Sequence, residues 1–147
     1  MDYLIYKSTA LVAPDSAACR DIVTVSQRNN AGFGLTGFLH AEPGLFIQYL
    51  EGPAKPLWAL YERLHLDPRH RDLRLLGRGH LDRRRFVDWR MGYSDEQVLS
   101  FADFKAQVSV PGPAADAPRD EAIYFLKVAC ARIDIGIVEA PLVAPDL

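Results

Sequence analysis

Cysteine is scarce in this sequence, and neither sign of charge dominates it. Cys19 and Cys130 both fall in helix-like stretches rather than in the loop-rich, paired spacing of a disulfide framework. The formal net charge of -2 gives the chain no general attraction for nucleic acid or anionic membranes. No apolar run approaches the roughly 20 residues of a bilayer-spanning helix, and the acidic start lacks the basic region of a signal peptide. We therefore expect a cytoplasmic protein that binds neither membranes nor nucleic acid directly.

The residue patterns of metal sites and of common enzymes are also missing. The four histidines and two cysteines show no Cys-x-x-Cys or His-x-x-x-His spacing, so we expect no metal site. There is no glycine-rich phosphate loop and no nucleophile-elbow sequence. Glu51 and Asp67 make a weak catalytic pair, because we expect Glu51 to face away from Gln48 and to cap the helix that begins at Pro53. The basic run 83–85 is interpreted as a solvated turn.

The apolar content is sufficient for one compact domain, since 49% of the 147 residues are hydrophobic. Runs of β-branched and aromatic residues, helical periodicities and turn signals together predict the elements of the first two thirds. They are a strand at 3–9, a helix from 15 or 16 to 29, strands at 35–41 and 45–50, a helix from 53 to 67, and strands at 72–80 and 86–93. Their β-α-β-β-α-β-β order predicts an α+β, ferredoxin-like sheet extended by one strand, with both helices on one face.

After this region, the strand-rich pattern gives way to helix-like segments and a linker. We therefore divide the chain into a domain at 1–95 and a C-terminal extension at 96–147. The extension is predicted to contain a short helix at 96–108, a Pro/Ala linker at 110–118, an amphipathic helix at 119–134 and a loose tail. The second helix carries a broad apolar stripe of Ala122, Phe125, Leu126, Ala129 and Ile133. We expect this stripe to cover either the free face of the sheet or a partner.

Two polar residues stand where the strand pattern calls for apolar ones. Gln48 shares a strand face with Phe46 and Leu50, and a buried amide left without partners costs about 1 to 3 kcal/mol. Tyr6 lies on a similar face of the first strand. In a split βαβ sheet these two strands are neighbours, so the two side chains can meet. Taken alone, a buried Tyr-Gln pair is more often a structural hydrogen bond than a functional device.

Further polar residues gather near the ends of the two predicted helices. Asn29 and Asn30 end the first helix, and Asp67, Arg69 and His70 follow the second. Apolar walls with a few converging polar groups are typical of a site for a flat heteroaromatic ligand. The sequence therefore favours a small-molecule site between the helices.

Five short segments closely resemble the successive signatures of the BLUF family, blue-light sensors that use FAD. The resemblance covers roughly residues 3 to 93. It is specific because the five segments occur in the same order, and at the same spacing, as in the family. The segments are Tyr6-Lys7-Ser8, Asn30 with Gly34-Leu35-Thr36-Gly37, Phe46-Ile47-Gln48-Tyr49-Leu50-Glu51-Gly52, Asp67-Pro68-Arg69-His70 and Arg85-Phe86-Val87-Asp88-Trp89-Arg90-Met91.

The resemblance implies a non-covalent flavin between the two sheet-facing helices. FAD is the expected cofactor, with FMN and riboflavin open as alternatives. Asn30 would bond the carbonyl and imide edge of the ring, while Asn29, Arg69 and Asp67, with His70 beside them, would bind the remaining polar edge or hold the pocket together. The wall of the first helix would be formed by Ile22, Val25 and Ser26.

The resemblance also implies a photochemical role for four residues. In the family, blue light excites the flavin and the tyrosine, here Tyr6, gives up an electron and a proton. Recombination leaves the glutamine, here Gln48, rotated or tautomerised, and the absorption shifts to the red. Trp89 and Met91, expected on the last strand, would carry the signal outward, with ordinary core packing as the alternative for both.

The predicted function is a light-regulated binding module without catalysis of its own. Its resemblance to short members of the family implies homo-oligomers and an effector in trans, either a cyclic-nucleotide enzyme or a transcriptional regulator. The helix at 119–134 is the expected connection to that effector. Two alternatives stay open: a small ferredoxin-like enzyme that uses Asp67, Arg69 and His70 on an anionic substrate, and a flavin-binding protein that no longer signals.

Overall fold

The fold is taken from a computed structural model that describes residues 1–87, 89–107 and 117–134. The predicted tail and most of the predicted linker lie outside these residues. The elements are β1 (Asp2–Ala10), α1 (Ala17–Phe33), β2 (Thr36–Glu42), β3 (Leu45–Gly52), α2 (Ala54–Leu64), β4 (His70–His80), β5 (Gly92–Asp95), α3 (Phe101–Gln107) and α4 (Ala117–Asp134).

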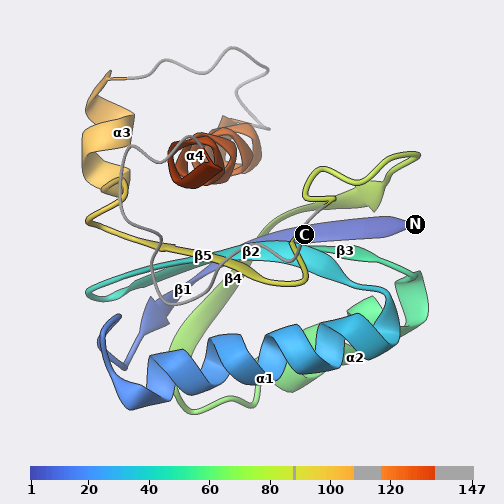
Figure 1. The fold of residues 1–147 in the computed structure, drawn as a ribbon. Helices are drawn as coiled ribbons and strands as arrows, with labels where there is room; N and C mark the ends of the chain where they lie inside the picture. The colour runs from blue at the N-terminus through green and yellow to red at the C-terminus, as the bar shows by residue number, and fades with distance from the viewer. Residues whose placement is uncertain (88, 108–116, 135–147) are drawn as a thin grey trace.

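One five-stranded sheet organises the chain, in the order β4-β1-β3-β2-β5. The β4-β1, β1-β3 and β3-β2 pairs are antiparallel, and β5 runs parallel to β2. The helices α1 and α2 lie together on one face, and α3 and α4 lie on the other (Figure 1). This arrangement confirms the predicted ferredoxin-like α+β fold, including its element order.

The first helix shows how local sequence sets its ends. Ser16 caps α1, because its side chain accepts a hydrogen bond from the backbone N–H of Cys19. The helix continues past Asn29 and ends only at Gly34, whose φ of 71° is the left-handed conformation that favours glycine. The prediction that Asn29 ends the helix was therefore wrong by about one turn.

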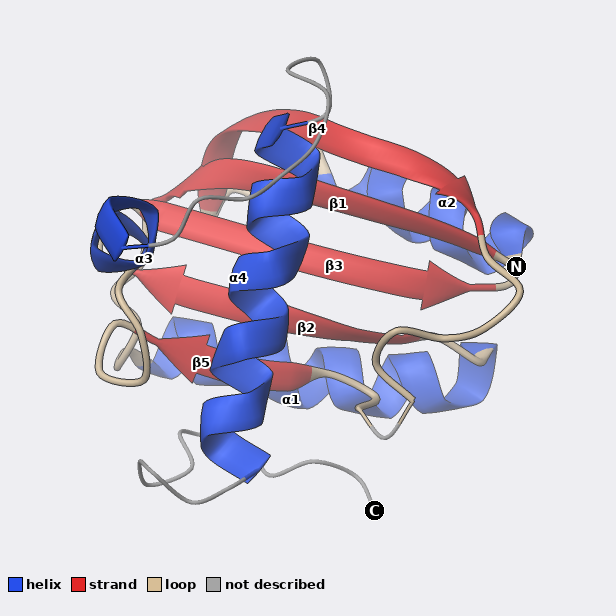
Figure 2. Cartoon of the chain, turned by 90° about the horizontal axis from the view of Figure 1, so that it is seen from above, coloured by secondary structure: helices blue, strands red, loops and turns tan. Residues whose placement is uncertain are grey.

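The two faces of the sheet hold separate cores. Alternate side chains of β1 and β3 point to opposite faces, so Leu4 and Leu50 join the core under α1 and α2, while Ile5 and Ile47 join the core under α4. The helix α4 crosses the strands (Figure 2). Its predicted stripe is confirmed as buried, so α4 covers the free face of its own sheet; the stripe is Ala122, Phe125, Leu126, Ala129 and Ile133.

The last strand is shorter than predicted, because β5 begins at Gly92 and not at residue 86. The backbone before it is held by other groups. The buried Glu51 carboxylate accepts the backbone N–H groups of Arg85 and Phe86, each at 2.7 Å, and Gly37 donates its N–H to the Trp89 carbonyl at 2.9 Å. Glu51 thus anchors this segment, and the expectation that it caps α2 was wrong.

The basic turn is also bound to the fold rather than simply solvated. Arg84 donates to the Gly34 carbonyl at 2.7 Å and to the Thr36 hydroxyl at 3.0 Å. The guanidinium of Arg85 lies 4.4 Å from the centre of the Tyr3 ring. Two of the three arginines therefore fasten the segment that leads to Trp89 and Met91.

Candidate functional site

The site is built around a buried contact between two neighbouring strands. Tyr6 on β1 and Gln48 on β3 are register partners, and the Tyr6 hydroxyl donates a hydrogen bond to Gln48 Oε1. Their residues are 2% and 4% exposed. Burial raises the pKa of Tyr6 well above its ordinary value, and the nearby charge of Asp67 raises it further. The phenol therefore keeps its proton and acts as the donor in this contact.

The other end of the Gln48 amide faces Met91. Gln48 Nε2 lies 3.6 Å from Met91 Sδ, and a thioether is a weak acceptor. Trp89 lies on the opposite side of the sheet, where its ring packs against Phe38 at 5.4 Å between centroids. Both residues precede β5 rather than lying on it, so their predicted place on the last strand was wrong. Met91, and not Trp89, is the neighbour of Gln48.

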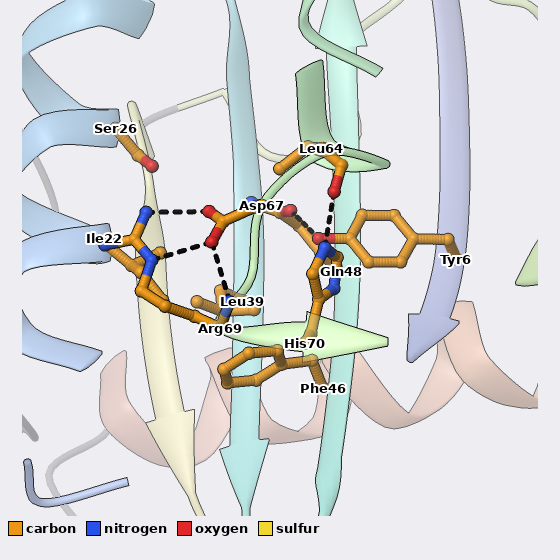
Figure 3. A pocket seen from close by; sticks show the side chains of 10 residues that line it. All are labelled: Tyr6, Ile22, Ser26, Leu39, Phe46, Gln48, Leu64, Asp67, Arg69 and His70. Atoms are coloured by element: carbon orange, nitrogen blue, oxygen red, sulfur yellow. Dashed lines mark hydrogen bonds and ion pairs between the residues drawn. The ribbon is translucent and has the colours of Figure 1, made fainter. Parts of the chain in front are cut away.

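A pocket opens beside this contact, between the sheet and the helices α1 and α2 (Figure 3). Its empty volume, including space open to solvent, is about 330 Å³. The lining combines apolar walls with polar groups, and consists of Tyr6, Ile22, Ser26, Leu39, Phe46, Gln48, Leu64, Asp67, Arg69 and His70.

One end of the pocket is charged. Arg69 binds Asp67 through two parallel contacts, Nε to Oδ1 at 2.9 Å and Nη2 to Oδ2 at 2.7 Å (Figure 3). The hydrogen bond from Arg69 lowers the pKa of Asp67 and outweighs the opposing effect of burial. A third contact, at 3.4 Å, joins Arg69 to Asp21 on α1. The guanidinium is thereby fixed between the end of α2 and the first helix.

His70 is held by both ring nitrogens. Its Nε2 lies 2.6 Å from the Leu64 carbonyl oxygen, which can only accept, so Nε2 carries the hydrogen. Nδ1 lies 2.7 Å from the Ser8 hydroxyl. The ring also meets Tyr6 edge-on at 6.0 Å between centroids. His70 therefore positions the pocket wall beside the tyrosine.

Three of the predicted binding residues do not line the pocket. Asn30 is buried, and its Nδ2 donates to the Arg90 carbonyl at 2.7 Å. Val25 is half-buried and Asn29 is exposed. Gln27, which sequence reasoning missed, donates to the Met91 carbonyl at 3.2 Å. Asn30 and Gln27 thus hold the backbone on either side of Met91, a role that the sequence does not signal because the contacts span some sixty residues.

Other pocket residues were missed although a signal existed. Phe46 lies two residues before Gln48 on β3, so it shares the same face. Leu39 is the register partner of Gln48 on β2. Leu64 is the last residue of α2. The alternation that predicted the position of Gln48 would also have placed Phe46 in the site.

The residues fit a flavin. Leu39, Phe46 and Ile22 offer apolar surface for a flat ring, while Gln48, Arg69 and Asp67 supply the donors and acceptors that the polar edges of such a ring require. Within the part of the chain that the structure describes, no three His, Cys, Asp or Glu side chains gather as a metal site would need.

Comparison with known proteins decides the family. Residues 1–92 match the family model of BLUF, described as sensors of blue-light using FAD. The chain belongs to the BLUF family. FAD is therefore the cofactor of this BLUF domain, and the matched region is a light-sensing regulatory domain rather than a catalytic one.

Relatives of this BLUF chain include larger enzymes and a protein of similar extent. The photoactivated adenylate cyclase subunit beta of Euglena gracilis is 35% identical over 80 residues, which are 54% of this chain and 9% of that protein. A bacterial light-regulated adenylyl cyclase has a TM-score of 0.64 at 28% identity, over 72% of this chain and 32% of that one. BlrB, a BLUF protein in its dark state, has a TM-score of 0.66 at 27% identity, over 84% of this chain and 96% of its own. Among the described helices, none has the length and apolar character needed to cross a bilayer.

Proposed function

We propose that this BLUF domain is a reversible blue-light switch in which Tyr6 and Gln48 are the photoactive pair. The observation that carries the proposal is the buried chain of contacts from the Tyr6 hydroxyl through the Gln48 amide to Met91, of which Tyr6 and Gln48 line the pocket. A phenol can give up an electron and a proton, and an amide holds a donor and an acceptor that can exchange places. These are the capacities that a hydrogen-bond switch requires.

The bound flavin supplies blue-light absorption and, once excited, an electron acceptor. Tyr6 enters the reaction protonated, because burial raises its pKa, and its proton already points at Gln48 Oε1. Gln48 then rotates or tautomerises. Little opposes the loss of its contact with Met91, since a thioether sulfur accepts a hydrogen bond only weakly.

The remaining site residues have binding or positioning roles in this proposal. Ile22 and Ser26 form the α1 wall, and the Asp67-Arg69 pair and His70 form the polar end. Trp89 and Met91 would transmit the change outward. The role of Asn30 at the carbonyl and imide edge of the ring stays a prediction, as do the roles of Val25 and Asn29, because all three residues lie outside the pocket lining.

A pair of tyrosine variants tests the switch. Tyr6 and Tyr49 are buried phenols on adjacent strands, each with a bonded hydroxyl, but they face opposite sides of the sheet. We expect flavin-loaded Tyr6→Phe to bind flavin and to lose the light-induced red shift, because its ring has no proton or easily removed electron to give. We expect Tyr49→Phe to keep the shift. A normal red shift in flavin-loaded Tyr6→Phe would overturn the proposed mechanism.

The signal is proposed to act on a separate effector protein, with the BLUF chain itself as a homo-oligomer. Support comes from the relatives: adenylyl cyclases carry a similar domain within much longer chains, and BlrB is matched over 96% of its length. We favour a cyclic-nucleotide enzyme over a transcriptional regulator as the effector. A cytoplasmic location is part of the proposal, consistent with two free cysteines. Analytical ultracentrifugation of the flavin-loaded protein tests the oligomer, and a single monomeric species at all concentrations would contradict it.

A further inference from the structure

The face of the sheet under α4 contains a buried polar group that the proposed switch does not use. His40 on β2 contacts the Ser94 hydroxyl through Nδ1 and a carboxylate oxygen of Glu42 through Nε2, each at 2.8 Å. The same oxygen, Glu42 Oε1, accepts the backbone N–H of Phe101 at 3.0 Å. We call these four residues the His40 cluster.

The directions of these hydrogen bonds follow from the carboxylate. The bond to His40 lowers the pKa of Glu42, and the backbone N–H of Phe101 lowers it further against the opposing effect of burial. Glu42 is therefore ionised and only accepts, so His40 Nε2 carries a hydrogen. In the neutral ring, Nδ1 then accepts the hydroxyl proton of Ser94. Each bond has one donor and one acceptor, which gives the imidazole a defined orientation.

A serine, a histidine and a carboxylate in a row are also the groups of a hydrolytic triad. Burial excludes that reading, because Ser94 and His40 are both 0% exposed. The Phe125 ring of α4 closes the space above His40 with perpendicular ring planes and 4.6 Å between centroids. No substrate reaches the Ser94 hydroxyl, so the cluster connects elements rather than catalysing a reaction.

The elements that the cluster connects lie between the switch and the C-terminal helices. Ser94 is on β5, three residues after Met91, the neighbour of Gln48. His40 is its register partner on β2, and β2 is the only strand paired with β5 among the described residues. Glu42 binds the first residue of α3, and Phe125 belongs to α4. One imidazole thus contacts β5 through Ser94, α4 through the Phe125 ring and α3 through Glu42.

We propose that His40 is the positioning residue that couples the photoactive pair to α3 and α4. This inference rests on the proposed switch of Tyr6 and Gln48. When Gln48 releases Met91, the short strand β5 shifts, and Ser94 moves with it because an extended strand transmits displacement along its axis. The Ser94 hydroxyl carries the imidazole with it. His40 then disturbs its contact with Phe125 on α4 and its bond to Glu42, which holds the start of α3.

The experiment measures the light response at the flavin site and at the helices α3 and α4 in one flavin-loaded sample. Absorption in darkness and under blue light reports the flavin site, and amide hydrogen exchange followed by mass spectrometry reports peptides covering 101–107 and 117–134. Ser94→Ala and His40→Phe break the connection; the first removes a single oxygen, and the second keeps an aromatic ring against Phe125. Tyr49→Phe is the matched control, since it removes a buried hydroxyl from the same face outside the cluster.

A conservative exchange separates coupling from mere packing. Glu42→Gln keeps a carbonyl oxygen that can accept from both His40 and Phe101, whereas Glu42→Met has a similar length and no such acceptor. We expect Glu42→Gln to retain the light-induced change in exchange at 101–107 and Glu42→Met to lose it. Equal behaviour of the two variants would contradict the role of this hydrogen bond.

The expected result is a normal red shift in Ser94→Ala and His40→Phe, with loss of the light-induced change in exchange over 117–134. Tyr49→Phe should retain both signals. A light-induced exchange change in Ser94→Ala equal to that of the wild type would overturn the coupling role, even if His40→Phe fails to fold. Wild-type protein with a red shift but no change in either helix would also overturn it, while leaving the proposed switch intact. Absence of the red shift in the wild type would instead overturn the proposed function, and the coupling role with it.

Discussion

The two faces of the sheet are built from the same strands but have different contents. Toward α1 and α2, β1 and β3 present Tyr6 and Gln48 beside a pocket. Toward α4 the same strands present Tyr3 and Tyr49, whose rings stack at 5.7 Å between centroids within a closed aromatic core. Because successive residues of a strand face opposite ways, a ligand site and a helix-binding surface can lie back to back without sharing side chains.

The segment before β5 is where the two faces meet. Met91 is buried against Gln48, whereas Trp89, two residues earlier, is buried in the core under α4. A displacement of this segment therefore acts on both cores. In the proposed switch, this segment lies between the Gln48 contact and the strand that carries Ser94.

The largest expected effect comes from truncating an aromatic residue on the closed face. Phe125 is fully buried between the sheet and α3, and Phe125→Ala should lower the free energy of unfolding by about 3 to 5 kcal/mol because it leaves a cavity. The flavin spectrum of the folded fraction should not change. Urea denaturation with flavin absorption as a second probe measures both quantities.

The matched truncation on the open face is Phe46→Ala. Phe46 is also buried, but it lines the pocket, so its loss should weaken flavin binding in addition to stability. Flavin titration by fluorescence quenching measures the difference. A change in the red shift of Phe125→Ala would contradict the assignment of the flavin site to one face of the sheet. Flavin binding by Phe46→Ala as tight as that of the wild type would contradict it too.

A smaller effect is expected at the charged end of the pocket. The Asp67 and Arg69 side chains are 20% and 34% exposed, so the pair should contribute no more than about 1 kcal/mol to stability. The lowered pKa of Asp67 means that this contribution is complete above its ordinary pKa of 3.8 and is lost as the pH falls through the lowered value. Asp67→Asn should remove that part of the acid dependence.

Urea unfolding of flavin-free wild type and Asp67→Asn between neutral pH and the acid limit tests this assignment. The two stabilities should converge as the pH falls, because protonated Asp67 no longer attracts Arg69 as an anion. Curves that stay parallel across the whole range would show that the pair contributes nothing that depends on pH.

Much of the site could be predicted from local patterns. Period-two alternation placed Gln48 on a buried face, and the split βαβ order placed Tyr6 beside it, as the register of β1 and β3 confirms. The stripe on α4 likewise predicted which side chains it buries. These predictions succeeded because each depends on a repeat within one element or on the order of elements.

The features that were not predicted depend on contacts between residues far apart in the sequence. β5 begins late because Glu51 binds the backbone of residues 85 and 86, and nothing near residue 86 signals that carboxylate. The His40 cluster likewise joins residues 54 positions apart. Met91 and Trp89 lie on this anchored segment and face opposite cores, a placement that the family resemblance left open.

The central claim is tested most directly by the absorption spectrum of flavin-loaded protein in darkness, under blue light and during recovery. The account predicts a flavin spectrum that moves slightly to the red under light and returns thermally without bleaching, because the Tyr6-Gln48 contact rearranges and then resets. Bound flavin that only bleaches, or that does not respond, would contradict the switch and leave a flavin-binding domain that does not signal.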